Sequence, residues 1–110
     1  MKRETKEAII NFRNERDWTQ FHNPKDLAIS LSLEVAELLE NFQWSASEEA
    51  LRERYGAIRE ELADVIIYSV LFADVVGADM DEIVLEKLRR NAEKYPVEKA
   101  RGRKEKYDQL

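Results

Sequence analysis

Two pairs of acidic residues stand out because each pair lies inside an otherwise apolar stretch. Glu34 and Glu37 lie within LSLEVAELLENFQW, and Glu61 and Asp64 lie within ELADVIIY. Residues three apart share a helix face, so each pair directs its carboxylates to one side. Carboxylates among apolar residues are costly to bury without a partner. Because hard oxygen donors suit Mg²⁺ or Mn²⁺, the two pairs together predict a divalent metal site.

Three other interpretations compete with this one. An acidic pair can simply belong to a solvated helix face, which is common in a chain with 37% charged residues. A non-catalytic helical oligomerisation or interaction module would also carry solvated acids. A di-iron carboxylate bundle needs two Glu-x-x-His motifs, and the chain has one histidine. Two pairs, each within an apolar helix, favour the metal site over the solvated faces.

Four sequence blocks resemble a known family in their order and spacing. The blocks are FRNERDWTQFHNP, SLEVAELLENFQW, EELADVIIY and KLRRNAEKYPVEKARGR. They resemble the all-α nucleoside triphosphate pyrophosphohydrolases, the MazG-like proteins, and most closely the branch that cleaves dCTP. The resemblance extends from about Phe12 to Arg103, and all four acidic positions agree with it.

The resemblance implies an enzyme that cleaves a nucleoside triphosphate, dCTP or a modified dCTP, between its α and β phosphates. Its products would be a nucleoside monophosphate and pyrophosphate. Glu34, Glu37, Glu61 and Asp64 would be the catalytic metal ligands, with Mg²⁺ or Mn²⁺ bridging them to the phosphates. Glu37 is the marginal choice for the general base, with Glu40 as an assistant, although the sequence alone does not separate ligand from base.

A second group of residues is suited to the phosphate tail. Lys87, Asn91 and Lys94 lie at positions i, i+4 and i+7, on one face of the last long helix, and Tyr95 follows them. By pattern alone a solvated lysine-rich face explains them better. Their match to the family block K-x-x-x-N-x-x-(K/R)-Y-P implies contact with the triphosphate.

Aromatic residues are the candidates for base recognition. Trp18, His22 and Trp44 offer flat faces for stacking and N–H donors for a base edge. A lone histidine is more often structural, and a tryptophan after an apolar helix more often fills a core. Resemblance to the dCTP-cleaving branch implies that these residues, with Phe21 nearby, line the nucleobase pocket and that Tyr68 packs on the sugar.

The elements that must position these groups are helices. The sequence predicts helices over residues 4–16, 24–42 and 57–76, and a fourth from about 79 to 95, which make an all-α bundle of four main helices. Asn23 before Pro24 signals a helix start, and Gly77 signals a helix end. Ser45 and Glu48 form a possible capping box for a short helix that ends near Gly56. The β-branched run VIIYSVLF also fits a buried strand, but no second strand exists to pair with it.

Composition limits the class of protein. The 110 residues, 44% of them hydrophobic, suffice for a single domain over 1–110, with a charged tail from about residue 97. A net charge of −5 argues against a nucleic-acid polymer as partner. With no cysteine, no signal peptide and no apolar run long enough for a membrane, we expect a cytoplasmic protein. Helices that are apolar over most of their circumference predict a homo-oligomer, and the family resemblance implies a dimer or tetramer.

Overall fold

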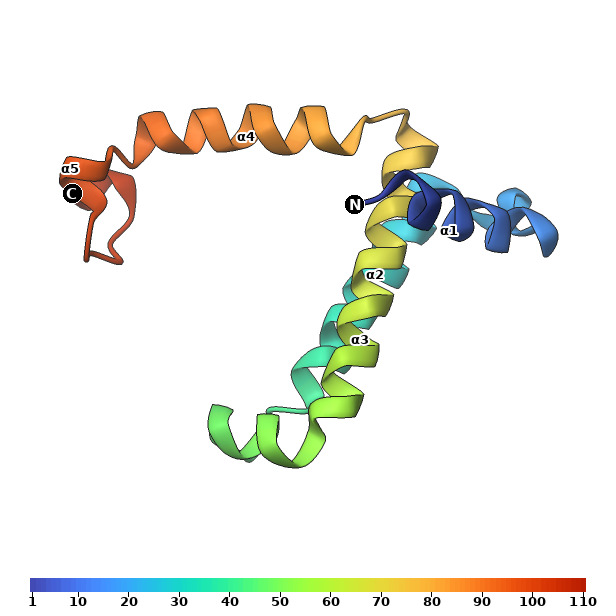
Figure 1. The fold of residues 1–110 in the computed structure, drawn as a ribbon, viewed down its shortest axis with the longest axis horizontal. Helices are drawn as coiled ribbons and strands as arrows, with labels where there is room; N and C mark the ends of the chain where they lie inside the picture. The colour runs from blue at the N-terminus through green and yellow to red at the C-terminus, as the bar shows by residue number, and fades with distance from the viewer. The chain divides into compact units, whose positions relative to one another are not determined.

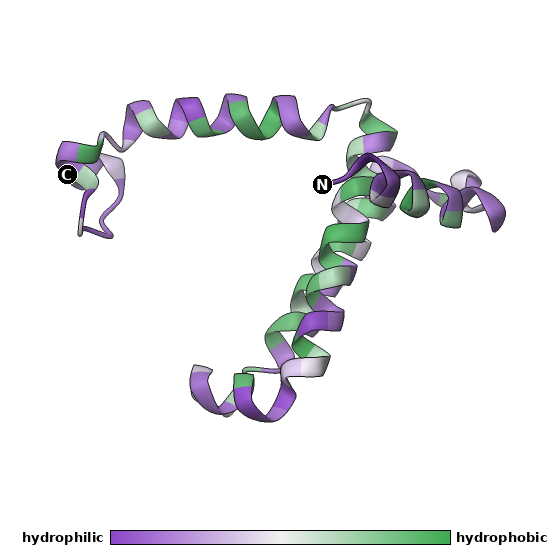
Figure 2. Ribbon diagram, viewed as in Figure 1, coloured by the Kyte–Doolittle hydropathy of each residue, from purple (hydrophilic) through white to green (hydrophobic).

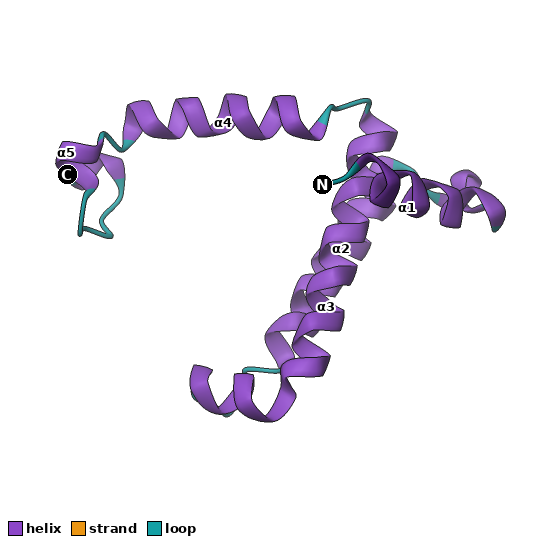
Figure 3. Ribbon diagram, viewed as in Figure 1, coloured by secondary structure: helices purple, strands orange, loops and turns teal.

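The computed structural model describes all residues from Met1 to Leu110 and contains helices and loops only (Figures 1 and 3). The elements are α1 (Arg3–Glu15), the 3₁₀ helix η1 (Trp18–Phe21), α2 (Pro24–Glu40), α3 (Ser47–Val76), α4 (Met80–Lys94), α5 (Val97–Ala100) and the 3₁₀ helix η2 (Tyr107–Gln109). The absence of strands confirms the all-α prediction, with four main helices. Assembly into dimers or tetramers stays a prediction.

The chain divides into two compact units, Met1–Gly77 and Ala78–Leu110. The expectation of a single domain over 1–110 stays a prediction.

In the first unit, α2 and α3 pack side by side and run in opposite directions (Figure 1). Apolar residues, green in Figure 2, are frequent along α2 and in the C-terminal part of α3, whereas the N-terminal turns of α3 are mainly hydrophilic. Leu27 of α2 and Val70 of α3 are the largest fully buried side chains, and Ala50, Ile58, Leu71 and Ala73 are buried with them. An ion pair joins α1 to α3, because Arg13 Nη1 donates to Asp74 Oδ2 at 2.6 Å.

Local signals account for most of the helix ends. The side chain of Asn23 accepts a hydrogen bond from the backbone N–H of Asp26 at 2.9 Å, and Pro24 occupies the first turn, as predicted. Gly77 ends α3 with φ +71°, the left-handed conformation that glycine adopts without strain. Asp79 caps α4 by accepting from the N–H of Glu82 at 2.9 Å.

The prediction of a capping box at Ser45 is wrong, whereas the break predicted near Gly56 is present two residues earlier, as a kink at Arg54. The helix begins at Ser47 without a side-chain cap and continues through Gly56 to Val76, with non-helical angles only at Arg54. The hydroxyl of Ser45 is engaged elsewhere, since it accepts a hydrogen bond from Arg54 Nη1 at 3.2 Å. The same nitrogen donates to the carbonyl oxygen of Asn41 at 3.0 Å, so Arg54 joins the link after α2 to the bend in α3.

The second unit consists of α4, the short helix α5 and the turn η2. The charged tail from residue 97 is therefore partly helical. Its aromatic residue Tyr107 packs edge-on against Tyr95, with ring centroids 6.1 Å apart. The ammonium nitrogen of Lys94 lies 5.0 Å from the centroid of the Tyr107 ring. In neither unit is there a helix with the length and apolar character needed to cross a bilayer.

Candidate active site

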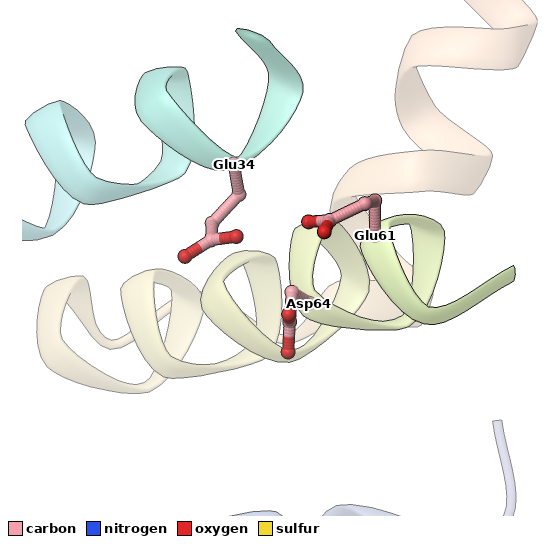
Figure 4. Close-up of side chains that lie close together, drawn as sticks. All are labelled: Glu34, Glu61 and Asp64. Carbon is pink, nitrogen blue, oxygen red and sulfur yellow. The ribbon is translucent and has the colours of Figure 1, made fainter. Parts of the chain in front are cut away.

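Three of the four predicted metal ligands meet between α2 and α3. Glu34 extends from α2 toward α3, which carries Glu61 and Asp64 one turn apart (Figure 4). Oxygen atoms of the three carboxylates all lie within 4.8 Å of one another, and all three side chains are half-buried. We call these three residues the acidic cluster. They converge because the close packing of α2 on α3 places Glu34 opposite the acidic face of α3.

The electrostatics of the acidic cluster favour a bound cation. Burial, a hydrogen bond with Glu37 and the charges of Glu37, Asp64 and Glu61 raise the pKa of Glu34 above its ordinary value. A hydrogen bond with Glu37, burial and the neighbouring carboxylates raise the pKa of Glu61. The Oε2 atoms of Glu34 and Glu61 are buried and have no hydrogen-bond partner. Unpartnered carboxylate oxygens at this spacing are a donor set that fits a hard divalent cation.

Glu37 lies at the edge of the acidic cluster. Its side chain is exposed, and it does not belong to the three residues whose oxygens converge. It is nevertheless close enough to influence the pKa of both Glu34 and Glu61. Its role as a fourth ligand or as the general base stays a prediction, as does the assistance of Glu40, which is also exposed.

A pocket of about 620 Å³ adjoins the acidic cluster. Its walls come from α1, η1 and α3, and are mainly apolar through residues such as Ile9, Phe12 and Ile67. Asp64 belongs both to the acidic cluster and to the pocket wall. A ligand in the pocket would therefore lie beside a cation held by the cluster.

Three of the residues predicted for base and sugar recognition line this pocket: Trp18, His22 and Tyr68. The ring of Trp18 lies edge-on to Phe12 at 5.7 Å and 6.2 Å from the imidazole of His22. Burial, followed by the charge of Arg13, lowers the pKa of His22, so its ring is neutral at pH 7, and its Nδ1 is buried without a partner. Burial and the nearby carboxylates raise the pKa of Tyr68, which keeps its hydroxyl group protonated and able to donate.

Trp44 and Phe21 do not line the pocket. Trp44 follows the end of α2, is 94% exposed and has φ +66°, a left-handed conformation that is rare for a bulky residue. It fills no core in this unit. Phe21 ends η1 with its ring 62% exposed. Contact of Trp44 with a base stays a prediction.

The residues predicted for the phosphate tail belong to the second unit. Lys87, Asn91 and Lys94 share one face of α4, and Tyr95 caps the end of that helix. Asn91 is close to the end of α4, and its carbonyl oxygen accepts the backbone N–H of Tyr95 at 2.8 Å. Their contact with a triphosphate stays a prediction.

The sequence interpretation missed Arg13, which lines the pocket with only 6% of its surface exposed. Its Nε donates to Asn14 Oδ1 at 3.1 Å, and its Nη1 donates to Asp74. A signal for it exists, since Arg13 is four residues after Ile9 and so continues the apolar stripe of α1. A charged residue on an apolar stripe is a candidate for a buried, partnered group.

Comparison with known proteins gives consistent matches. The model of the MazG-like family matches residues 29–110. The chain is 44% identical over 105 residues to dCTP pyrophosphatase 1 of Bos taurus and 43% identical to that of Homo sapiens. These alignments cover 90% of this chain but only 62% and 61% of the two relatives, so the chain spans about three-fifths of their length. A solved pyrophosphatase structure from Archaeoglobus fulgidus superposes with a TM-score of 0.80 at 44% identity, over 84% of this chain and 90% of that one.

Proposed function

Because the chain belongs to the MazG-like family, we propose that it is a Mg²⁺-dependent nucleoside triphosphate pyrophosphohydrolase. We propose dCTP or a modified dCTP as the substrate, because the relatives named above are dCTP pyrophosphatases. The products would be the nucleoside monophosphate and pyrophosphate.

One observation carries the proposal beyond the family. The acidic cluster and an apolar, aromatic pocket share Asp64, so a cation site and a site for a flat organic group adjoin. A nucleoside triphosphate has this composition, with an anionic tail that needs a cation and a planar base. Because carboxylates and phosphates repel each other, the anionic tail needs a cation between them. A purely apolar ligand or a free base would use the pocket but would have no need of the cation site.

Each residue then has a defined task. Glu34, Glu61 and Asp64 would hold Mg²⁺, with Mn²⁺ as a substitute. The bound ion would withdraw charge from phosphate oxygens and acidify the attacking water. Glu37, exposed at the edge of the acidic cluster, would take the proton of that water as general base.

The pocket would hold the nucleoside. Trp18 offers a ring face for the base, and neutral His22 offers a hydrogen bond to its edge. Tyr68 is one turn after Asp64 on α3, and both residues line the pocket. With the cation at Asp64 and the base beside Trp18, Tyr68 would pack on the sugar. Lys87, Asn91, Lys94 and Tyr95 of α4 would contact the phosphates. Trp44 would contribute a second stacking face.

We also propose that the protein works as a homo-oligomer, a dimer or a tetramer. Within the first unit, α2 leaves Ile29, Leu33 and Leu39 exposed and α3 leaves Leu62 exposed. Exposed apolar side chains in such number on two neighbouring helices indicate an interface, which a second subunit would bury.

The test is release of pyrophosphate from a panel of nucleoside triphosphates with Mg²⁺, Mn²⁺ or excess EDTA. We expect activity with either metal, preference for a cytosine nucleotide, and no activity in EDTA. Glu34→Gln and Asp64→Asn should each lower turnover on every base about a hundredfold or more, since loss of even a residue that supports a metal ligand costs about 10–100-fold.

Glu48→Gln is the matched control, because Glu48 is an exposed acid in the first turn of α3. It should keep wild-type turnover. Full activity in EDTA would disprove the metal site. Absence of hydrolysis across the whole panel would instead favour a non-catalytic interaction module.

A further inference from the structure

Arg13 is the one buried charged side chain in the first unit, and it lies in the pocket wall. Burying a guanidinium group is costly unless hydrogen bonds compensate for its lost water. Asp74 and Asn14 supply two such bonds, at 2.6 and 3.1 Å. Only Arg13 is buried in this pair, since 38% of the Asp74 side chain is exposed. Such an ion pair is seldom a better link between helices than apolar packing, and the surrounding wall is apolar. The position of Arg13 therefore calls for an explanation besides joining α1 to α3.

The geometry of the guanidinium group leaves a donor for a ligand. Its hydrogen bonds use Nε and Nη1, so Nη2 is not required by either partner. The group is planar and rigid, and two bonds fix its orientation. Because Arg13 lines the pocket, its Nη2 is the candidate donor to a ligand, and the group that carries it is held in place before any ligand enters.

The place of Arg13 along the pocket indicates which part of a nucleotide it meets. Its partner Asp74 is ten residues after Asp64 on α3, which corresponds to about 15 Å along the helix axis at about 1.5 Å per residue. Arg13 is therefore remote from the acidic cluster, beyond Tyr68 and Leu71. A nucleotide whose phosphates lie at the cluster would have its base, and not its phosphates, near Arg13. The carboxylate of Asp74 beside the guanidinium also disfavours an anion there.

We propose that Arg13 is a specificity-determining residue, which donates a hydrogen bond from Nη2 to an acceptor on the edge of the nucleobase. This inference rests on the proposed function. His22 lines the same pocket, but its unpartnered Nδ1 is buried, so the recognition rests on Arg13. A donor at Nη2 matches the unprotonated ring nitrogen of cytosine and mismatches the N–H at the same position in uracil.

The experiment compares dCTP with dUTP, which differ only on this edge, in the wild type and in Arg13→Met. Loss of a hydrogen bond to a charged donor costs about ten- to hundredfold. We expect kcat/KM for dCTP to fall by this factor, mainly through KM, and the dCTP-to-dUTP ratio to approach one. The Mg²⁺ requirement should not change. Arg3→Met, which removes an exposed arginine of the same helix, should behave as the wild type.

Arg13→Lys separates recognition from a structural role. Lysine keeps the charge and a bond to Asp74 but lacks the fork that serves two partners at once. If Arg13 recognises the base, Arg13→Lys loses the dCTP-to-dUTP ratio while it keeps the wild-type unfolding midpoint. If Arg13 only joins α1 to α3, Arg13→Lys keeps the wild-type ratio, and the inference is overturned.

The failure of the two proposals can be told apart. A wild-type protein that ranks dCTP above dUTP, with the same ranking in Arg13→Met and Arg13→Lys, overturns the role of Arg13 alone. A wild-type protein that hydrolyses no nucleotide in the presence of Mg²⁺ overturns the proposed function and this inference with it.

Discussion

Three carboxylates whose oxygens lie within 4.8 Å of one another repel each other, and the packing of α2 on α3 holds them together in spite of that repulsion. The raised pKa values of Glu34 and Glu61 express the same cost. A folded-state pKa above the ordinary value of 4.5 means that the folded protein binds these protons more tightly than the unfolded chain does. Binding of protons and binding of a divalent cation are then alternative ways to reduce the repulsion among the three carboxylates.

The resulting prediction concerns pH. In metal-free protein, the stability contributed by these two protonated groups is present below about pH 4.5 and is lost as pH rises through their raised pKa values. We expect the free energy of unfolding to fall more over this range in the wild type than in Glu34→Gln. Mg²⁺ should raise the unfolding midpoint more at about pH 7 than at about pH 5, because it competes with protons.

Thermal unfolding at a series of pH values, with and without Mg²⁺, measures this effect. Glu48→Gln, outside the acidic cluster, should follow the wild type. An increase in midpoint with Mg²⁺ that does not depend on pH, or that persists in Glu34→Gln, would contradict the prediction.

Trp44 provides a second prediction at this scale. A left-handed conformation costs a non-glycine residue roughly 1–2 kcal/mol, and a side chain that is 94% exposed recovers little by packing within its unit. Trp44→Gly should therefore leave the free energy of unfolding unchanged or raise it. If Trp44 stacks on the base, Trp44→Ala and Trp44→Gly should each raise KM about tenfold or more, since a stacking contact contributes about 1–3 kcal/mol.

The control for Trp44 is Phe21→Ala, because Phe21 is also exposed and aromatic and does not line the pocket. It should not alter KM. Unchanged KM values in both Trp44 variants, measured on the same nucleotide panel, would place base recognition elsewhere.

At the scale of elements, the glycine inside α3 and the glycine at its C-cap have opposite requirements. Gly56 has ordinary helical angles and Gly77 has φ +71°, and a Cβ atom at either position would meet nothing within 4 Å. Gly56→Ala should stabilise the protein by about 0.5–1 kcal/mol, because alanine loses less backbone entropy in a helix. Gly77→Ala should destabilise it by about 1–2 kcal/mol through the left-handed conformation. Urea unfolding of the two variants measures the change in the free energy of unfolding, which should be positive for Gly56→Ala and negative for Gly77→Ala. Changes of the same sign would contradict the assignment of Gly77 as the C-cap.

Most helix ends followed from local pattern, whereas the partner of the Ser45 hydroxyl did not. Asn23, Gly77 and Asp79 act on backbone groups within a few residues of themselves, so the sequence predicts their effect directly. The hydroxyl of Ser45 had two possible partners, the start of the next helix and Arg54. Which of the two partners the hydroxyl binds depends on the path of the chain around residues 41–54, and the hydrophobic periodicity of the sequence does not predict that path. The break that the sequence predicted near Gly56 lies at Arg54.

The candidate site divides in the same way. The convergence of Glu34, Glu61 and Asp64 was predictable, because carboxylates within apolar helices are costly to bury unless a proton or a cation compensates for their charge. Glu37 is three residues after Glu34, and about 60° around the helix from it, so whether it faces α3 depends on how α2 is rotated. Burial of Arg13 depends on Asp74, which is 61 residues away in the sequence. The apolar stripe of α1 could have indicated that Arg13 is buried, but nothing local indicates that Asp74 is its partner.

At the scale of the whole molecule, the apolar surface of α2 leads to a prediction about assembly. Leu33 is 58% exposed within its unit, and Ile29 lies one turn before it on the same face. We expect the protein to be a dimer or a tetramer at micromolar concentration, and Leu33→Glu to shift it toward the monomer with its helicity retained. Sedimentation velocity with circular dichroism measures both properties.

Lys25→Glu is the matched control for this change, since Lys25 is an exposed residue in the first turn of α2. It should leave the sedimentation coefficient unchanged. A wild-type protein that sediments as a compact monomer with full helicity would show that α2 is covered from within its own chain.

The contrast between the two tryptophans gives the protein an optical use. Trp18 lines the pocket beside Phe12 and His22 and is 40% exposed, whereas Trp44 is 94% exposed. No other tryptophan is present. Replacement of Trp44 by phenylalanine leaves one indole, and its emission wavelength and intensity then report on the pocket alone. Titration of that variant with a nucleotide follows occupancy of the pocket as fluorescence, without a label and without turnover.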